Sequence, residues 1–186
     1  MGLCGLALYR GGRMTGIREI TSLCIRVARD YPGIAEAAPG TGSVLILGSP
    51  GWGKTTLLRD LIRIRSENEQ VGVVDERGEL FPDGFDTGKR TDILRGCRKG
   101  DGLDRLVCTM GPGCIAVDEI TSEEDCKALV QAAGCGVTLL ATAHAGSRQE
   151  FISREIYRPL WEKNIFQWMI LMGPDKNYRT ERMGSK

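Results

Sequence analysis

Apolar residues gather along this chain in short continuous runs, each bounded by glycine or by charged residues. Runs of this length are typical of strands that are buried on both faces of a sheet. The pattern predicts core strands over residues 43–47, 71–74, 114–117, 137–143 and 165–172.

The stretches between these runs repeat apolar residues at helical spacing. This spacing predicts one helix over residues 57–63 and another over 121–133. In the second helix, Thr121 and Glu124 fit a capping box and Gly134 fits a C-terminal cap. We expect further helical structure over residues 148–157, with a short helix or turn over 159–163. Because predicted strands and helices alternate, the chain is predicted to be α/β, with a mostly parallel central sheet flanked by helices.

Four segments carry weaker patterns. Residues 3–9 and 14–20 flank a glycine turn and predict a hairpin, which is either the end of an upstream domain or an edge addition to the sheet. Residues 21–30 fit a strand or a helix, and we favour a helix. Residues 81–104 are rich in Gly, Asp, Arg and Lys and predict a long functional loop, whereas the polar tail from Gly173 is expected to fray.

The first core strand runs into a glycine-rich turn and then a helix. Gly48, Gly53, Lys54 and Thr55 fit the pattern G-x-x-x-x-G-K-[ST] of a phosphate-binding P-loop. Tight glycine turns present several backbone N–H groups to one anion, and the helix N-terminus adds its dipole. Lys54 is predicted to reach the β- and γ-phosphates of ATP, and the Thr55 hydroxyl to ligate Mg²⁺. The predicted nucleotide-binding residues are Gly48, Ser49, Pro50, Gly51, Trp52, Gly53, Lys54, Thr55 and Thr56.

Candidate catalytic residues follow three other predicted strands. Downstream of a P-loop, Asp118 is predicted to hold Mg²⁺ and Glu119 to polarise an attacking water. Asp75 and Glu76 end another strand, where site residues and a solvated turn are equally compatible with the pattern. His144 is the only histidine and ends a core strand, so it is a candidate for a hydrogen bond to a γ-phosphate or a water.

Composition narrows the classes of function. A net charge of +1 and an aromatic content of 6% argue against a nucleic-acid groove. The seven cysteines are scattered, and with one histidine they give no zinc spacing and no expected disulfide framework. This usage indicates a reducing, cytoplasmic compartment.

No apolar run reaches the roughly 18 residues of a membrane-spanning helix, so membrane association is expected only through partners. The loop lacks G-x-G-x-x-G, which excludes a Rossmann dinucleotide site.

Four stretches in this order resemble the secretion-type ATPases of type II and type IV machines, and more specifically the stage III sporulation protein AA family. They are the P-loop, residues 73–77 (similar to the family's acidic box), 115–120 (its Walker B strand) and 141–147 (its histidine box). The resemblance covers nearly the whole chain. It implies a RecA-like ATPase domain over residues 41–186, with residues 1–40 as the hairpin and linker left from an upstream domain.

The resemblance also implies partners and roles. The family's motor forms a homo-oligomeric ring, expected to be a hexamer, and drives membrane-embedded channel proteins of the sporulation stage III complex. Glu76 becomes a second candidate for aligning water. Cys108 and Gly113 stand where the related stretch commonly has Arg and Asp. If that arginine contacts phosphate or a neighbouring subunit, another must replace it, and the candidates are Arg90, Arg95 and Arg105.

The sequence therefore favours a Mg²⁺-dependent ATPase working as a motor. Three alternatives stay open at this level. A DNA- or RNA-translocating ATPase is disfavoured by charge and aromatic content, and a small-molecule kinase has less use for Glu119. The third alternative is a module that binds nucleotide with little turnover.

Overall fold

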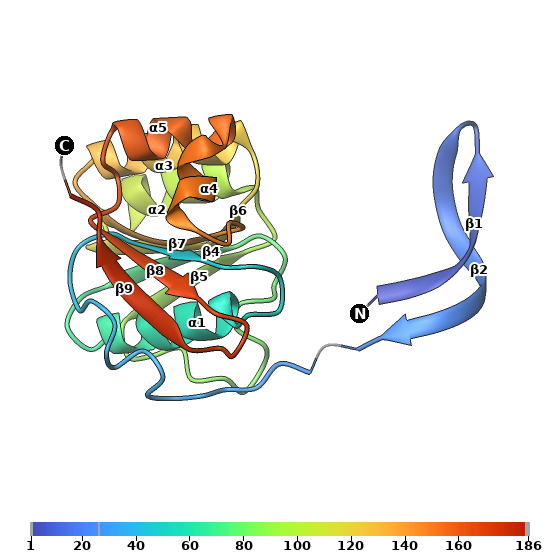
Figure 1. The fold of residues 1–186 in the computed structure, drawn as a ribbon, viewed down its shortest axis with the longest axis horizontal. Coiled ribbons are helices and arrows are strands. Elements are labelled where there is room, and N and C mark those ends of the chain that lie inside the picture. The colour runs from blue at the N-terminus through green and yellow to red at the C-terminus, as the bar shows by residue number, and fades with distance from the viewer. Residues whose placement is uncertain (1, 26, 185–186) are drawn as a thin grey trace.

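The computed structural model describes residues 2–25 and 27–184. Its first element is a hairpin of β1 (Gly2–Arg10) and β2 (Arg13–Cys24), which lies away from the rest of the ribbon (Figure 1). The hairpin is confirmed, and it is a separate two-stranded sheet, not an edge addition. The helix favoured over residues 21–30 is wrong. The segment instead pairs with β1 as far as Cys24, opposite Gly2, and the described residues after it form no helix.

A seven-stranded sheet lies at the centre of the rest of the molecule, with its strands in the order β5-β4-β6-β7-β3-β8-β9. All neighbouring strands are parallel except β8 and β9, so the predicted α/β class with a mostly parallel sheet is confirmed. The strands are β3 (Val44–Leu47), β4 (Val71–Asp75), β5 (Thr91–Arg95), β6 (Cys114–Ile120), β7 (Thr138–Ala143), β8 (Trp168–Met172) and β9 (Tyr178–Arg182).

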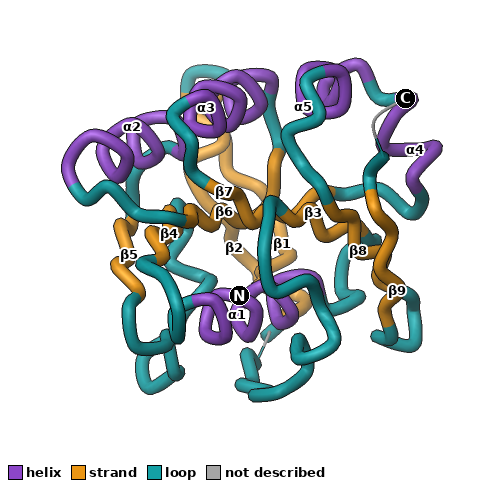
Figure 2. The backbone as a smooth tube through the Cα atoms, turned by 90° about the vertical axis from the view of Figure 1, so that its left-hand side faces the viewer, coloured by secondary structure: helices purple, strands orange, loops and turns teal. Residues whose placement is uncertain are grey.

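Helices cover both faces of this sheet (Figure 2). They are α1 (Lys54–Arg65), α2 (Lys99–Thr109), α3 (Glu123–Gly134), α4 (Arg148–Ser153), the 3₁₀ turn η1 (Glu155–Tyr157) and α5 (Arg158–Glu162). Helix α1 packs on one face, and α2 to α5 lie on the other. Alternate residues of β3 enter different cores: Val44 and Ile46 join the α1 side, and Leu45 and Leu47 the opposite side. This double burial explains why β3 is apolar at every position.

Two segments predicted to be irregular are ordered elements. The expectation of a long loop over residues 81–104 is wrong, because β5 and the start of α2 lie there. Their polar composition hid them, since β5 is an edge strand and α2 buries only one side. A Cβ on Gly102 would lie 2.6 Å from Val74 Cγ1, so only glycine lets α2 pack this close to β4. The polar tail is also ordered, because residues 178–182 pair with β8 as β9.

The cap of α3 lies one residue later than expected. The Ser122 hydroxyl accepts from Asp125 N at 3.1 Å, and the Asp125 carboxylate accepts from Ser122 N at 3.2 Å. The predicted pair of Thr121 and Glu124 is therefore wrong as a capping box, because the helix begins at Glu123. The predicted C-terminal cap at Gly134 is also one residue early, because Gly134 is the last helical residue and Cys135 is the C-cap.

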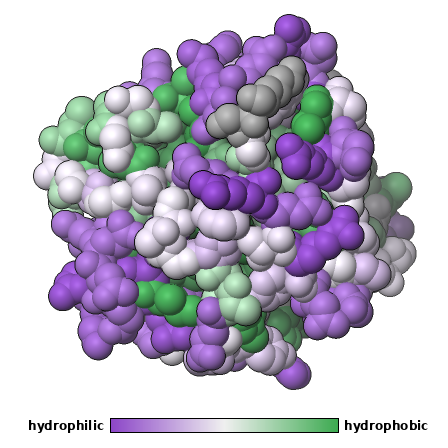
Figure 3. Space-filling view, turned by 60° about the vertical axis from the view of Figure 1, so that its left-hand side comes forward, coloured by the Kyte–Doolittle hydropathy of each residue, from purple (hydrophilic) through white to green (hydrophobic). Residues whose placement is uncertain are grey.

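The sheet domain has a buried apolar core, whereas the hairpin exposes several large apolar side chains, such as Leu6, Tyr9 and Ile20. The face drawn in Figure 3 is mostly hydrophilic, with small scattered hydrophobic spots. Cys114 lies in the core, as predicted for a cysteine inside an apolar run. Within the described residues, none of the helices combines the length and the apolar character that crossing a membrane requires.

Candidate functional site

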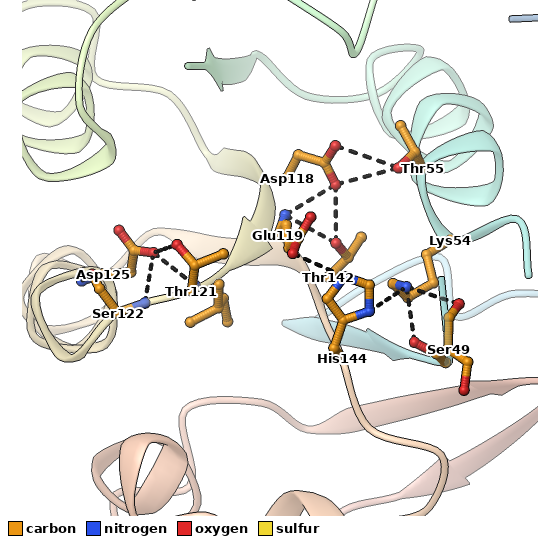
Figure 4. Close-up of polar contacts among 12 residues, drawn as sticks. Ser49, Lys54, Thr55, Asp118, Glu119, Thr121, Ser122, Asp125, Thr142 and His144 are labelled. Atoms are coloured by element: carbon orange, nitrogen blue, oxygen red, sulfur yellow. Dashed lines mark hydrogen bonds and ion pairs between the residues drawn. The ribbon is translucent and has the colours of Figure 1, made fainter. Parts of the chain in front are cut away.

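The glycine-rich loop joins β3 to α1 at the carboxyl edge of the sheet. Gly53 is the N-cap of α1 and has a φ of 99°, a left-handed conformation that favours glycine. A Cβ on Gly48 would lie 2.9 Å from the Cβ of Met172 in the adjacent strand β8. The Lys54 ammonium donates to the carbonyl oxygens of Gly48 at 2.8 Å and Ser49 at 3.2 Å (Figure 4). The loop therefore curls around the first side chain of α1.

A β-bulge in β6 sets the directions of Asp118 and Glu119. Val117 lies opposite Ala141 and Ile120 opposite Ala143, so β6 carries one residue more than β7 over this interval. Neighbouring residues of a regular strand point to opposite faces, and a bulge interrupts that alternation. Both carboxylates consequently reach groups at the same edge of the sheet (Figure 4).

Asp118 is held in a network that crosses three elements. The Thr55 hydroxyl at the start of α1 donates to Asp118 Oδ2 at 3.3 Å, and the Thr142 hydroxyl of β7 donates to Oδ1 at 2.9 Å. Glu119 N donates to Asp118 Oδ1 at 2.9 Å and to the Thr142 hydroxyl at 3.0 Å. Hydroxyl and carboxylate oxygens are the donor set that Mg²⁺ prefers, so Thr55 and Asp118 fit a magnesium site.

Sequence reasoning missed Thr142. Its side chain is fully buried in a strand that is otherwise apolar around it. A polar residue in such a run must find a hydrogen-bond partner, and this position lies two residues before His144. A threonine inside an apolar strand, close to a candidate site residue, is therefore the sequence signal that could have identified Thr142.

His144 connects the loop lysine to Glu119. Its Nε2 lies 2.8 Å from Glu119 Oε1, and its Nδ1 lies 3.1 Å from Lys54 Nζ. A lysine ammonium can only donate, so Nδ1 accepts and the ring proton lies on Nε2, which donates to Glu119. The only histidine of the chain thus links a cation to a carboxylate at the end of β7.

Lys54 sits in an environment that favours a bound anion. Burial lowers the pKa of Lys54, and the nearby charges of Glu119 and Asp118 partly oppose that effect. An ammonium whose charge is destabilised by burial gains from an additional negative group, because a nearby anion stabilises the protonated form. The loop and Lys54 line a cavity of about 1000 Å³, which they share with Thr55, Asp118, Glu119 and His144.

The second acidic pair behaves differently. Asp75 is buried, and its carboxylate accepts from the backbone N–H groups of Glu79 at 3.0 Å and Leu80 at 3.1 Å. Glu76 does not line the large cavity but a second, small one beside Asp118 and Glu119, and its Oε2 is 2.7 Å from Nζ of Lys99, a residue that the sequence did not single out. Asp75 is therefore a structural cap for its turn, whereas Glu76 stays near Glu119 without a direct hydrogen bond among the described contacts.

The structure thus brings five of the predicted side chains together, from α1, β6 and the end of β7: Lys54, Thr55, Asp118, Glu119 and His144. Pro50 and Gly51 are exposed at the tip of the loop, and Trp52 packs against the core on the α1 side. Thr56 also lines the large cavity.

Solved structures with a similar fold include ATPases, one of them from a type IV secretion system. The DotB ATPase of Legionella pneumophila matches with a TM-score of 0.57 and 23% identity, covering 80% of this chain and 46% of that chain. The VirB11 ATPase of the Brucella suis type IV secretion system, in complex with sulphate, matches with a TM-score of 0.59 and 17% identity, covering 80% and 49%. The chain has the RecA-like α/β fold of these proteins.

Sequence comparison places the chain more narrowly. It is 36% identical over 184 residues to the stage III sporulation protein AA of Bacillus subtilis, which covers 89% of this chain. The chain spans 60% of the length of that relative. The family described as sporulation stage III, protein AA, matches residues 1–182. The chain therefore belongs to the sporulation stage III protein AA family.

Proposed function

We propose that this chain is a Mg²⁺-dependent ATPase motor domain. The observation that carries the proposal is the convergence of Lys54, Thr55, Asp118, Glu119 and His144 in one cavity beside the glycine-rich loop. A cation, a metal-binding oxygen pair and a carboxylate for water are the groups that phosphoryl transfer to water requires. Each lies within hydrogen-bond distance of another member of the set.

The loop and Lys54 bind the phosphates. Backbone N–H groups at the start of α1, together with the Lys54 ammonium, stabilise the charge of the β- and γ-phosphates. To do so, Lys54 exchanges its contacts with Gly48 O, Ser49 O and His144 for phosphate oxygens. The Thr55 hydroxyl and the Asp118 carboxylate hold Mg²⁺, which when bound neutralises charge that develops on the transferred phosphoryl group.

Glu119 orients the attacking water, and His144 senses the γ-phosphate. The hydrogen bond between His144 Nε2 and Glu119 Oε1, at 2.8 Å, fixes the carboxylate at the cavity wall. Because Nδ1 of the same ring contacts Lys54, any movement of Lys54 toward phosphate changes the support of Glu119. Phosphate binding and water positioning are thereby linked through a single imidazole.

We further propose that the domain works as a ring, expected to be a hexamer, on membrane-embedded channel proteins of the sporulation stage III complex. Membership of the sporulation family and the fold shared with secretion ATPases support this. We propose that residues 1–40 end an upstream domain. Two observations support this proposal: every residue of β1 is exposed, and the hairpin lies away from the sheet domain (Figure 1).

Steady-state phosphate release from ATP and Mg²⁺, measured across a wide range of protein concentration, tests the proposal. We expect wild-type turnover per subunit to rise with concentration as rings form. Glu119→Gln should bind ATP but hydrolyse it poorly, and Lys54→Ala should lose binding. Equal hydrolysis by Glu119→Gln and the wild type would remove Glu119 from its role. ATP binding without turnover at any concentration would favour the nucleotide-binding module instead.

A further inference from the structure

Lys99 is a buried lysine beside the candidate site. It is the first residue of α2, and its side chain is only 8% exposed. Its Nζ lies 2.7 Å from Glu76 Oε2 and 3.5 Å from Asp125 Oδ2. The ammonium therefore lies between two carboxylates, one after β4 and one in the first turn of α3.

The position is an unfavourable one for a lysine. The N-terminus of a helix carries a positive partial charge, so a cation there is destabilised by the helix dipole. Burial adds the cost of removing the ammonium from water, and an apolar residue at such a site is often as stable or more stable. Local rules that are broken in this way concentrate at functional sites. Stability alone thus gives no reason for a lysine here.

Lys99 is connected to the turn that follows Glu119. Asp125 Oδ2, the carboxylate oxygen that pairs with Lys99, also accepts from Thr121 N at 2.8 Å and from the Thr121 hydroxyl at 3.1 Å. Thr121 directly follows β6, the strand that carries Glu119. A small cavity at this edge is lined by Glu76, Lys99 and Glu119 together with Asp118. The Lys99 ammonium thus contacts the Glu76 carboxylate directly and, through Asp125, reaches Thr121 at the end of β6.

We propose that Lys99 is a positioning residue for hydrolysis, acting through Glu76. It holds the Glu76 carboxylate at the wall of the small cavity that Asp118 and Glu119 also line, so that Glu76 supports Glu119 in positioning the attacking water. This inference rests on the proposed function. Lys99 does not line the large cavity beside the glycine-rich loop, so its role concerns turnover rather than nucleotide affinity.

The test compares wild type, Lys99→Met, Glu76→Gln and the double variant in steady-state ATP hydrolysis. We expect Lys99→Met to lower kcat by about 10- to 100-fold, the usual effect of removing a residue that orients site groups. The Kd for ATP, measured by competition with a fluorescent ATP analogue, should stay within about twofold, because a residue outside the nucleotide cavity adds no binding contact. The double variant should be no slower than Glu76→Gln alone, since Lys99 acts through that carboxylate.

Arg65→Met is the matched control. Arg65 is also a buried cation, but it donates to the carbonyl oxygen of Gly42, before β3, and pairs with Glu69, before β4, at the opposite edge of the sheet. Its loss should lower the Tm and leave kcat unchanged. Lys99→Gln keeps a donor toward Glu76, so its kcat should lie closer to the wild type than that of Glu76→Gln; this comparison replaces the methionine variant if that variant does not fold.

Two results would overturn the inference while leaving the proposed function intact. One is a Lys99→Met variant with a lower Tm but wild-type kcat, which would make the lysine merely structural. The other is a double variant in which the two losses multiply, which would separate Lys99 from Glu76. A wild-type protein without turnover would instead overturn the proposed function, and the inference with it.

Discussion

The buried hydroxyl of Thr142 gives the sharpest test of the site's architecture. Replacing Thr142 with valine keeps the shape of the side chain and removes only the hydroxyl. That group donates to Asp118 Oδ1 at 2.9 Å and accepts from Glu119 N at 3.0 Å. Glu119 N keeps its second acceptor, Asp118 Oδ1 at 2.9 Å, so the variant leaves this N–H paired.

The expected loss of stability follows from these contacts. A hydrogen bond to a charged group contributes about 1.5–3 kcal/mol. The methyl group that valine adds in a fully buried position returns about 0.8 kcal/mol. The difference is a destabilisation of about 1–2 kcal/mol. For a domain of this size, each kcal/mol shifts the Tm by about 2–4 °C, so the Tm should fall by about 2–8 °C.

Thermal and urea unfolding of the full chain measure this change. Thr138→Val is the matched control, because Thr138 lies in the same strand and its hydroxyl donates to Gly113 O at an exposed position. We expect that variant to stay within about 0.5 kcal/mol of the wild type. Thr142→Ser, which keeps the hydroxyl, should be more stable than Thr142→Val if the hydrogen bond outweighs the lost methyl.

Two outcomes would refute this reasoning. If Thr142→Val is as stable as the wild type, the hydroxyl does not hold Asp118. If Thr138→Val loses as much stability as Thr142→Val, the loss is a general property of the strand and not of the bond to Asp118.

Two further predictions rest on burial. The folded-state pKa of Lys54 lies below the ordinary 10.5 of the unfolded chain, so the unfolded state binds more protons between these values. The free energy of unfolding should therefore rise with pH through that window, and rise less in Lys54→Met, as urea titrations can measure. Burial raises the pKa of Cys114 to about 11 and of Cys126 to about 12. Iodoacetamide should label exposed Cys4 and Cys108 in the native protein and spare both buried thiols, by mass spectrometry.

The core of the fold was predictable because its strands are buried on both faces. The run Val44–Leu47 is apolar at every position since each residue enters one of the two cores. The two edge strands of the sheet, β5 and β9, were not predictable because they are not buried on both faces. Strand β5 is only partly buried and β9 is largely exposed, so neither shows an apolar run. Their positions depend on pairing with β4 and β8, which is tertiary information.

Part of the candidate site was likewise predictable from the sequence, and part depends on contacts between distant segments. The glycine-rich loop is a contiguous pattern whose backbone conformation dictates its residues, so it could be identified without a structure. Lys99 has no such pattern, because its partners Glu76 and Asp125 lie far from it along the chain. A single lysine in a polar stretch resembles a solvated one until its burial is known. Contacts between distant elements are what a single sequence does not encode locally.

The two acidic pairs show how small the missing information is. Asp75-Glu76 and Asp118-Glu119 each follow a valine at the end of a buried strand, and Val74 lies directly opposite Val117. Strand β4 stays in regular register with β5 up to Asp75, so its two acidic residues diverge, one into the turn and the other toward Lys99. Strand β6 bulges against β7 between Val117 and Ile120, and both of its carboxylates reach the same cavity. One extra residue in β6 therefore brings both of its carboxylates into the cavity, whereas in β4, which has no such bulge, Asp75 caps a turn. The pairing register with the neighbouring strand decides where the extra residue lies.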